Sequence, residues 1–561
     1  MKLSLLALLV LVASVSAQEP AYGKRPTPQP APQPADVCES PLKLHHPESK
    51  VLGKWAKYTG KPQTNRRGCR PKKNFIFMVS DGFGSTSETI AREFYQYAAL
   101  GDDKKAIDDL ESILPLDTLL VGAARTKSSS SWVTDSASAA TALAAGKKTY
   151  NAAVGVDSKQ IPVATVLEAA KHHGFVTGVV ATSRATHATP AGWTAHVADR
   201  DSENHIAAQQ IGDNPLGRSA DLIFGGGKRH FIPKSVKGSK RDDERDLLKE
   251  AREKYSWKTI ADSRDQLVAM PKTKAALPAL GVFASSNLDY EIDRNVTAQP
   301  SLAEMADAAL TILADASSEC DSPGFFIMIE GSRIDHAAHT NDAATHIHEI
   351  WHTSMLCRLS SRLCKPTPTL VPFPPRITKR WCDGRLASRP VRGPDDPLVC
   401  VAPGPNRQGQ GLIEKVGPMI TGYKGDDVEA HIRKVCADFL GVSDVTAAEM
   451  KELVQGRADA IAKKYGDAYV FPMDIPLAKL MSVRALVGFT TNGHTAADVN
   501  VYAINAPGLR GHMDNTYLAK YSAEFIGVWA SLPKLSKRLA GIDIGPQPKK
   551  KRSVDSSHNH H

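Results

Sequence analysis

The chain has 561 residues, of which 42% are hydrophobic and 23% charged, and its formal net charge is +10. This composition excludes collagen-like, low-complexity and wholly disordered proteins. The positive charge is unevenly spread, because residues 351–410 hold ten Lys and Arg, three Asp and no Glu. That stretch alone supplies +7, and a second basic cluster covers residues 549–552. The net charge is therefore weak evidence for an anionic partner, and we expect no nucleic-acid binding.

The N-terminus has the features of a secretory signal peptide over residues 1–17. Lys2 precedes an apolar run over residues 3–15 that is too short to span a bilayer, and small residues follow it. The alternative is a buried N-terminal helix. The later sequence contains no membrane-length apolar run and no lipid-anchor signal, so we expect no membrane attachment. We expect export to the extracellular space, the vacuole or the cell-wall space, with a glycosylation sequon at Asn295 and Thr297.

The eight cysteines suit an oxidising compartment. Four of them lie between residues 357 and 400. The other four, Cys38, Cys69, Cys320 and Cys436, are enough for two disulfides whose pairing the sequence does not fix. None has the Cys/His spacing of a structural zinc site.

In chain order, a Pro-rich lead-in and N-terminal segment covers residues 18–70, and a regular pattern follows it. Short apolar runs that end on polar residues predict buried strands over 74–80, 178–182 and 325–329. Helical patterns lie between them, over 91–97, 163–173 and 301–314. Strands that alternate with helices predict an α/β protein, a three-layer α/β/α sandwich with a largely parallel central sheet. In such a sheet the chemistry lies beyond the carboxyl ends of the strands.

Two segments place reactive side chains at a strand end and at a helix start. Asp81 directly follows the first strand and precedes a glycine turn, where a plain Asx turn is the alternative. Asp135 and Ser136 begin a helix of small residues. A serine there meets the free N–H groups and the dipole that favour a phosphate. The alternative is an N-cap followed by a tightly packed helix.

Three further segments offer metal ligands and a phosphate clamp. His187 and Thr189 follow the second strand, and Arg200 comes eleven residues later. A guanidinium holds two phosphate oxygens at once, although a lone arginine is commonly a solvated surface charge. The remaining candidate ligands are Glu330, Asp335, His339 and His494.

Spacing and residue type indicate what these candidates bind. Glu330 ends an apolar strand, and Asp335 and His339 have the i, i+4 spacing that shares one helix face. Asp and His suit zinc, whereas carboxylates and hydroxyls suit magnesium. The alternative is an Asp–His surface pair. His494 stands just before another strand.

Together these segments resemble the alkaline phosphatases, specifically a secreted eukaryotic enzyme of the fungal type. The family-specific strings are "VTDSASAATALAAGKKTYNAAVGVD" and "EGSRIDHAAH", and the similarity covers about residues 70–350 and 415–530. The resemblance implies hydrolysis of phosphate monoesters of broad range by a homodimer with two zinc ions and one magnesium ion.

The resemblance also implies a role for each matched position. Ser136 is the nucleophile that becomes phosphoserine, and Asp135 orients Arg200, which clamps the phosphate. The implied metal ligands are Asp335, His339 and His494 for one zinc, Asp81 between the second zinc and the magnesium, and Thr189 and Glu330 for the magnesium. His187 and His336 lie near the metals, at positions that vary within the family.

The chain departs from the family pattern between its two matched parts, 71–350 and 413–545. The family's second zinc takes two ligands from an Asp-His-Glu-Thr-Gly-Gly segment, which this chain lacks. In its place lies an aberrant stretch, 351–412, whose ten prolines suit a disordered insert and no buried strand. We hypothesise a reading-frame error or an unspliced intron: residues 376–379 can be encoded CGG ATC ACG AAA, and dropping two bases gives Asp-His-Glu. The alternative is a chance match that codon degeneracy allows. A basic tail follows over residues 546–561.

Three hypotheses follow for the function. The first is a metal-dependent phosphomonoesterase, which the Asp135, Ser136 and Arg200 set favours. The second is a related sulfatase, phosphodiesterase or phosphomutase on the same scaffold. The third is a secreted metal- or phosphate-binding pseudo-enzyme that lacks a complete second zinc site.

Overall fold

The computed structural model describes residues 72–100, 113–363, 413–462, 472–485, 487–489 and 491–547. The chain divides into two compact units, Met1–Thr64 and Asn65–His561, and all described residues belong to the second. The expected signal peptide, the whole lead-in over residues 18–70 with Cys38 and Cys69, and nearly all of the basic tail lie outside the described residues.

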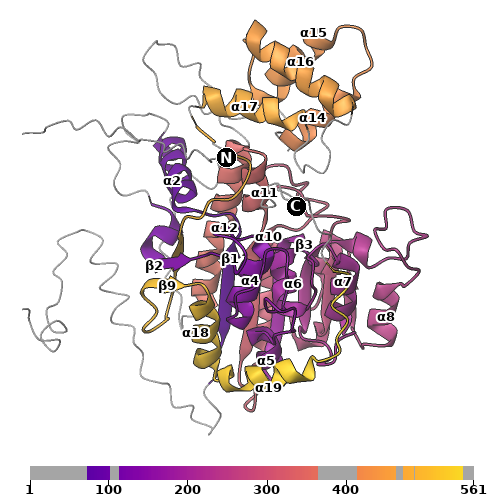
Figure 1. Ribbon diagram of the computed structural model, residues 1–561, viewed down its shortest axis with the longest axis vertical. Coiled ribbons are helices and arrows are strands. Elements are labelled where there is room, and N and C mark those ends of the chain that lie inside the picture. Colours follow the sequence, from indigo (N-terminus) through magenta and orange to yellow (C-terminus); the bar gives the residue numbers. More distant parts are fainter. Residues whose placement is uncertain are drawn as a thin grey trace, which may run out of the picture. The chain divides into compact units, whose positions relative to one another are not determined.

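A six-stranded sheet forms the centre of this unit (Figure 1). Its strand order is β1-β7-β3-β4-β6-β5, and all neighbouring strands run parallel. The strands are β1 (Phe75–Ser80), β3 (Val176–Arg184), β4 (Leu222–Gly226), β5 (Thr259–Ala261), β6 (Ala279–Val282) and β7 (Phe325–Gly331). The three strands predicted from the sequence are β1, β3 and β7, which lie next to one another. The α/β class with a parallel sheet is therefore confirmed.

Helices cover both faces of the sheet, which makes three layers (Figure 1). Along β7, Phe326 and Met328 join one apolar core, whereas Phe325 and Ile327 join the other. Strands buried on both faces read as continuous apolar runs, which is the pattern the sequence shows.

The first face packs against α4 (Ser136–Ala145), α5 (Val166–His172), α6 (Ala188–Thr194), α7 (Glu203–Ile211), α8 (Leu247–Glu253), α18 (Thr516–Ile526) and α19 (Leu532–Arg538). The second face packs against α9 (Arg264–Ala269), α10 (Leu302–Ala316) and α12 (Ala343–Leu363). Short 3-10 turns are η1 (Pro115–Leu119), η2 (Lys228–His230), η3 (Lys274–Ala276) and η5 (Trp529–Ser531).

Local capping sets the starts of the predicted helices. At α10, the Ser301 side chain accepts a hydrogen bond from the backbone of Glu304, and Glu304 accepts one from the backbone of Ser301. Thr165 and Glu168 make the same reciprocal pair at α5. Such boxes satisfy two backbone N–H groups that the helix leaves free. The third predicted helix, over residues 91–97, lies within α2 (Ser85–Leu100).

A smaller sheet and a group of helices complete the described unit. In the sheet, β2 (Leu120–Arg125) pairs antiparallel with β8 (Val499–Tyr502) and parallel with β9 (Gly511–Asp514). The helical unit comprises α14 (Ile413–Gly422), α15 (Val428–Val435), the π-helical turn η4 (Cys436–Leu440), α16 (Ala447–Ile461) and α17 (Asp474–Arg484). It has an apolar core of its own, built from residues such as Ile420, Val435 and Leu477.

The prediction of a disordered insert over residues 351–412 is wrong for the first part of that range, residues 351–363. Helix α12 continues to Leu363, and Trp351 and Leu356 on it are buried in the apolar cores. The start of the expected insert therefore belongs to the folded unit, because the side chains of Trp351 and Leu356 pack into its apolar cores. Residues 364–412 lie outside the described part of the chain.

The cysteines differ from the expected two bridges. Cys320 is disulfide-bonded, whereas Cys436 is a buried free thiol. Burial raises the pKa of the Cys436 thiol to about 11, so it stays protonated at neutral pH. Separately, no helix among the described residues has both the length and the apolar character of a membrane span.

Candidate active site

The carboxyl ends of β1 and β7 bring two acidic segments together. Asp81 follows β1, and Gly82 turns the chain with φ +66°. A Cβ on Gly82 would lie 2.5 Å from Cα of Asp335, so only glycine allows this approach. Asp335 lies on α11 (Arg333–His339), which follows β7. The turn thereby places Asp81 against the helix that carries the predicted zinc ligands.

Ser136 is the first residue of α4, and Asp135 is its N-cap. Asp135 Oδ1 accepts hydrogen bonds from the backbone N of Ser138 at 2.9 Å and from its hydroxyl at 2.8 Å. Because Asp135 caps the helix, the Ser136 hydroxyl is left to donate to Asp81 Oδ2 at 2.9 Å. The predicted nucleophile and the predicted metal ligand are thus in contact.

The small residues of α4 have a packing role as well. A Cβ on Gly192 of α6 would lie 2.5 Å from Cβ of Ala140, so the two helices pack closely. That contact brings α6 beside Ser136, the predicted nucleophile, with Thr189 Oγ1 3.5 Å from Asp81 Oδ2. The N-cap and the tightly packed helix, which were the alternative interpretation of this segment, are therefore present, and the catalytic role of Ser136 stays a prediction.

Arg200 is buried beside the serine and is no surface charge, with 4% of its area exposed. Its NH1 donates to Asp135 Oδ2 at 3.2 Å, and its NH2 donates to His187 Nε2 at 3.0 Å. Asp135 Oδ2 also accepts from the backbone N of Ala152 at 2.8 Å. Burial raises the pKa of Asp135, but the Arg200 charge and these hydrogen bonds outweigh it and lower the pKa overall.

Asp335, His339 and His494 form a cluster whose ligand atoms lie within 4.8 Å of one another. His494 Nε2 is 3.0 Å from Asp335 Oδ1, and His339 Nε2 is 3.3 Å from Asp335 Oδ2. The two imidazole Nε2 atoms are 3.1 Å apart. Since Asp335 is 1% exposed, this is no surface pair. One carboxylate and two imidazoles are a common ligand set for zinc.

The orientation of His339 is fixed from behind. Its Nδ1 lies 2.5 Å from the carbonyl oxygen of Asn492, and the Asn492 side chain donates to the His339 carbonyl at 2.8 Å. A metal-binding imidazole commonly donates its second N–H to such an oxygen, which points the other nitrogen inward. The sequence analysis did not identify Asn492. It lies only two residues before His494, but no expected motif includes it.

Glu330 and Asp81 are carboxyl groups whose pKa values are raised by burial and by neighbouring carboxylates. Glu330 lies in the sheet between Val79 of β1 and Ala181 of β3 and is fully buried. Burial, helped by the charge of Asp81, raises the pKa of Glu330 to about 8. Burial and the charge of Asp335 likewise raise the pKa of Asp81 to about 6.

These acidic groups fit divalent cations. Glu330 Oε1 has no hydrogen-bond partner among the described residues, although it is buried. Carboxylates with a nearby threonine hydroxyl suit magnesium, so Asp81, Thr189 and Glu330 fit that ion. In the described part of the chain, Asp335, His339 and His494 are the only three or more His, Cys, Asp or Glu whose ligand atoms all lie within 4.8 Å of one another, close enough to share one ion. Asp81 therefore has no second zinc-ligand cluster of its own there.

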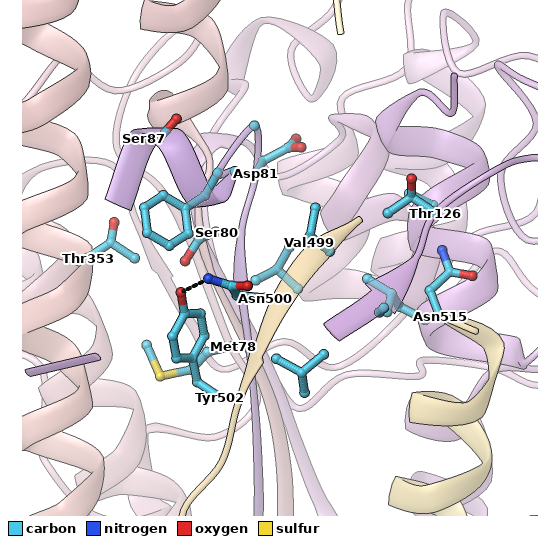
Figure 2. Close-up of a pocket in the computed structure, with 18 of the residues that line it drawn as sticks. Met78, Ser80, Asp81, Ser87, Thr126, Thr353, Val499, Asn500, Tyr502 and Asn515 are labelled. Atoms are coloured by element: carbon cyan, nitrogen blue, oxygen red, sulfur yellow. Dashed lines mark hydrogen bonds between the residues drawn. The ribbon is translucent and has the colours of Figure 1, made fainter. Parts of the chain in front are cut away.

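The cluster opens into a cavity of about 1040 Å³. Asp81, Ser136 and His494 line one end, and the cavity continues along β1. Figure 2 shows Asp81, Ser80 and Met78 following one another along this strand, with Asn500 and Tyr502 of β8 opposite them. Asn500 donates to the Tyr502 hydroxyl at 3.1 Å. Ser136 and Asp81 therefore face this cavity.

The family model described as "Alkaline phosphatase" matches residues 72–371 of this chain. The chain belongs to the alkaline phosphatase family. The match passes residue 351 by twenty residues, which agrees with the folded start of the expected insert.

Curated alkaline phosphatases are similar over most of their length. The alkaline phosphatase of Schizosaccharomyces pombe is 36% identical over 88% of both chains. The repressible alkaline phosphatase of Saccharomyces cerevisiae is 37% identical over 82% of both chains. Alkaline phosphatase 3 of Bacillus subtilis is 32% identical over 80% of this chain and 87% of its own. The fungal likeness and the enzyme class expected from the sequence, a phosphomonoesterase, are confirmed.

Solved alkaline phosphatase structures share the fold. The cold-active enzyme of Shewanella sp. has a TM-score of 0.58 at 26% identity and covers 81% of this chain and 100% of its own. The Thermus thermophilus enzyme has a TM-score of 0.62 at 24% identity and covers 83% and 96%. The three-layer alkaline phosphatase-like architecture is therefore confirmed.

Proposed function

We propose that this alkaline phosphatase hydrolyses phosphate monoesters through a phosphoserine at Ser136, with zinc and magnesium as its cofactors. The contact that carries the proposal is the 2.9 Å hydrogen bond from the Ser136 hydroxyl to Asp81 Oδ2 at the start of α4. It places a hydroxyl nucleophile among a helix N-terminus, a buried guanidinium and a cation-binding cluster.

The chain's own groups bind and orient the substrate. Arg200, held by Asp135 and His187, presents its guanidinium to two phosphate oxygens. The free N–H groups at the start of α4 add positive potential at the same place. Asp81 Oδ2 accepts the hydrogen of Ser136 and so defines the direction in which the hydroxyl proton leaves. These groups bind the phosphate oxygens and contact little of the leaving group, which supports a broad substrate range.

The metal ions supply, when bound, the positive charge that lowers the pKa of the serine hydroxyl and stabilises the transferring phosphoryl group. Asp335, His339 and His494 would hold a zinc ion, and Asp81, Thr189 and Glu330 would hold a magnesium ion. For a second zinc ion the described residues offer Asp81, which is fewer ligands than zinc takes in proteins.

We infer that the chain binds one zinc ion tightly and a second weakly, and that its turnover is low as a result. The experiment measures bound zinc per chain together with hydrolysis of p-nitrophenyl phosphate and of bis(p-nitrophenyl) phosphate. One tight zinc per chain and slow hydrolysis of the monoester are expected. A chain that carries Asp-His-Glu-Thr-Gly-Gly between His348 and Lys415 should gain both the second zinc and the rate.

Three outcomes of that experiment contradict the proposal in different ways. Two fully occupied zinc sites with ordinary phosphatase rates in the unmodified chain would contradict the incomplete second site. Faster hydrolysis of the bis-ester than of the monoester would instead favour the phosphodiesterase hypothesis. One bound zinc with no turnover, even after the segment is restored, would favour the pseudo-enzyme.

We further propose that the protein is exported and acts as a homodimer. The support for export is the sequence of residues 1–17 and the glycosylation sequon. Asn295 is exposed, and its side-chain oxygen accepts a hydrogen bond from the Thr297 hydroxyl at 2.7 Å. Its side chain is therefore on the surface, where a glycosylating enzyme can reach it. Light scattering of the purified protein tests the dimer, since a single 60.5 kDa species would contradict it.

A further inference from the structure

Arg333 connects the active-site helix α11 to the helical unit. Its side chain is 7% exposed, and its NH2 donates to Glu414 Oε2 of α14 at 3.2 Å. The guanidinium carbon lies 3.5 Å from the ring centroid of Tyr290, a stacked cation–π contact. Tyr290 in turn donates its hydroxyl to Glu414 Oε1 at 3.1 Å. Glu414 thus accepts one hydrogen bond at each carboxylate oxygen, and both fix the same guanidinium.

The other end of Arg333 faces the active site. Its NH1 lies 2.9 Å from Nδ1 of His336, the neighbour of the metal ligand Asp335. A guanidinium has five N–H donors and no acceptor, so His336 Nδ1 must accept this bond. The His336 ring is therefore neutral and carries its proton on Nε2.

A second histidine in the same chain of contacts, His187, also accepts a hydrogen bond from a guanidinium. Arg200 NH2 lies 3.0 Å from His187 Nε2, which must accept because the guanidinium only donates. The rings of His187 and His336 meet edge to face, with centroids 5.2 Å apart and planes at 84°. The two arginines and the two histidines each have at most 7% of their area exposed. Contacts therefore run without a break from Glu414 through Arg333, His336 and His187 to Arg200.

We propose that Arg333 and Glu414 are positioning residues for the phosphate clamp Arg200. Arg333 holds the ring of His336 in one orientation, His336 packs against His187, and His187 holds NH2 of Arg200. Glu414 keeps Arg333 in the geometry that makes this possible. The helical unit thereby contributes to phosphate binding through Glu414 of its first helix, α14.

The inference rests on the proposed role of Arg200, so the test has two separate readouts. The first is the dissociation constant for inorganic phosphate, measured by calorimetry on the full chain loaded with zinc and magnesium. The second is the tautomer of His336, read from the ¹⁵N shifts of its ring, which needs no turnover.

The first variant is Arg333→Lys, which keeps the positive charge but loses the planar guanidinium that reaches His336 and Glu414 at once. The second is Glu414→Gln, which keeps the shape of the side chain but loses its charge. The control is Glu429→Gln, which removes one exposed carboxylate from α15 of the same helical unit. We expect phosphate binding to weaken about tenfold in Arg333→Lys and about threefold in Glu414→Gln, and to stay unchanged in the control. The ¹⁵N shifts should place the proton on Nε2 in the wild type and show a mixture of tautomers in Arg333→Lys.

The two readouts separate the two ways of failing. Wild-type affinity for phosphate in both variants, at an unchanged melting temperature, would overturn the inference. If the wild type itself does not bind phosphate, the proposed function of Arg200 fails, and the His336 tautomer alone decides. A proton on Nδ1 of His336 in the wild type, or the same tautomer in Arg333→Lys, would then overturn the inference.

Discussion

The Asp135→Asn substitution tests whether the buried pair of Asp135 and Arg200 organises the phosphate site. In the wild type, Asp135 Oδ1 serves Ser138 and Oδ2 serves both Ala152 and Arg200. An amide can keep one oxygen for Ser138. Its NH2 group then faces two donors, the Ala152 N–H and the Arg200 guanidinium.

The expected cost follows from those two contacts. A lost hydrogen bond to a charged group costs about 1.5–3 kcal/mol, and an unsatisfied buried N–H costs about 1–3 kcal/mol. Breaking one side of a buried ion pair costs about 3–5 kcal/mol in total. We therefore expect the free energy of unfolding to fall by about 3–5 kcal/mol and phosphate affinity to fall with it, because Arg200 loses its orientation.

Urea unfolding at neutral pH, with and without inorganic phosphate, measures both effects. The matched control is Asp246→Asn at the N-cap of α8, where Asp246 accepts a hydrogen bond from the backbone of Lys249 at 3.0 Å. Asn caps helices about as well as Asp, so this control should lose at most a few tenths of a kcal/mol. A loss below about 1 kcal/mol in Asp135→Asn would refute the reasoning.

The pH dependence gives a second check on the same pair. The pKa of Asp135 is lower in the folded protein than the ordinary value of 3.8. The stability it contributes is therefore present above pH 3.8 and is lost as the pH falls through the lowered pKa. The gap in unfolding free energy between wild type and variant should be constant near neutrality and narrow below pH 3.8. A gap that widens towards acid would contradict the sign.

Three further outcomes are expected. The Ser136→Ala variant should lose turnover by about three orders of magnitude or more, while one lost hydrogen bond changes its unfolding free energy by only about 1 kcal/mol; kinetics and urea unfolding check this. In chelator-treated protein, the free energy of unfolding should fall as the pH rises from about 4.5 to 8, because the raised pKa values of Asp81 and Glu330 favour the protonated folded state. Urea unfolding across that range measures this, and metal-loaded protein should not show the fall. Protein secreted from a glycosylating host should begin near Gln18 and should lose one glycan in Asn295→Gln, and mass spectrometry that finds an intact Met1 would contradict export.

Local patterns in the sequence were enough for the parts of the site that lie close together in the chain. The apolar strand before Asp81 placed that residue at a strand end, and the i, i+4 spacing placed Asp335 and His339 on one face of a helix. Arg200 and His494 were assigned through the family resemblance. Their places depend on how distant segments pack, and no spacing rule reports that.

The contacts of Arg333 illustrate what the sequence could not provide. Glu414 is 81 residues away in the chain and belongs to a helix of the helical unit, which the sequence reading did not separate from the main domain. The strand order that puts β7 between β1 and β3 is likewise invisible in the pattern, because all three strands read as similar apolar runs. Chain folding, and no local signal, fixes both.

The error at residue 351 has a different origin. The basic, Pro-rich composition was averaged over about sixty residues, which hid the helical start of the stretch. Trp351 and Leu356 supply the apolar side chains that α12 buries, whereas the prolines begin at Pro366. A shorter window would have separated the two.

Trapping the phosphorylated enzyme tests the central claim most directly. The zinc- and magnesium-loaded chain is incubated with a radiolabelled phosphate monoester, denatured rapidly and mapped by peptide mass spectrometry. The account predicts phosphate on the peptide that begins α4, at Ser136, and no label in Ser136→Ala. Label on another residue, or hydrolysis that continues at the wild-type rate in Ser136→Ala, would contradict it.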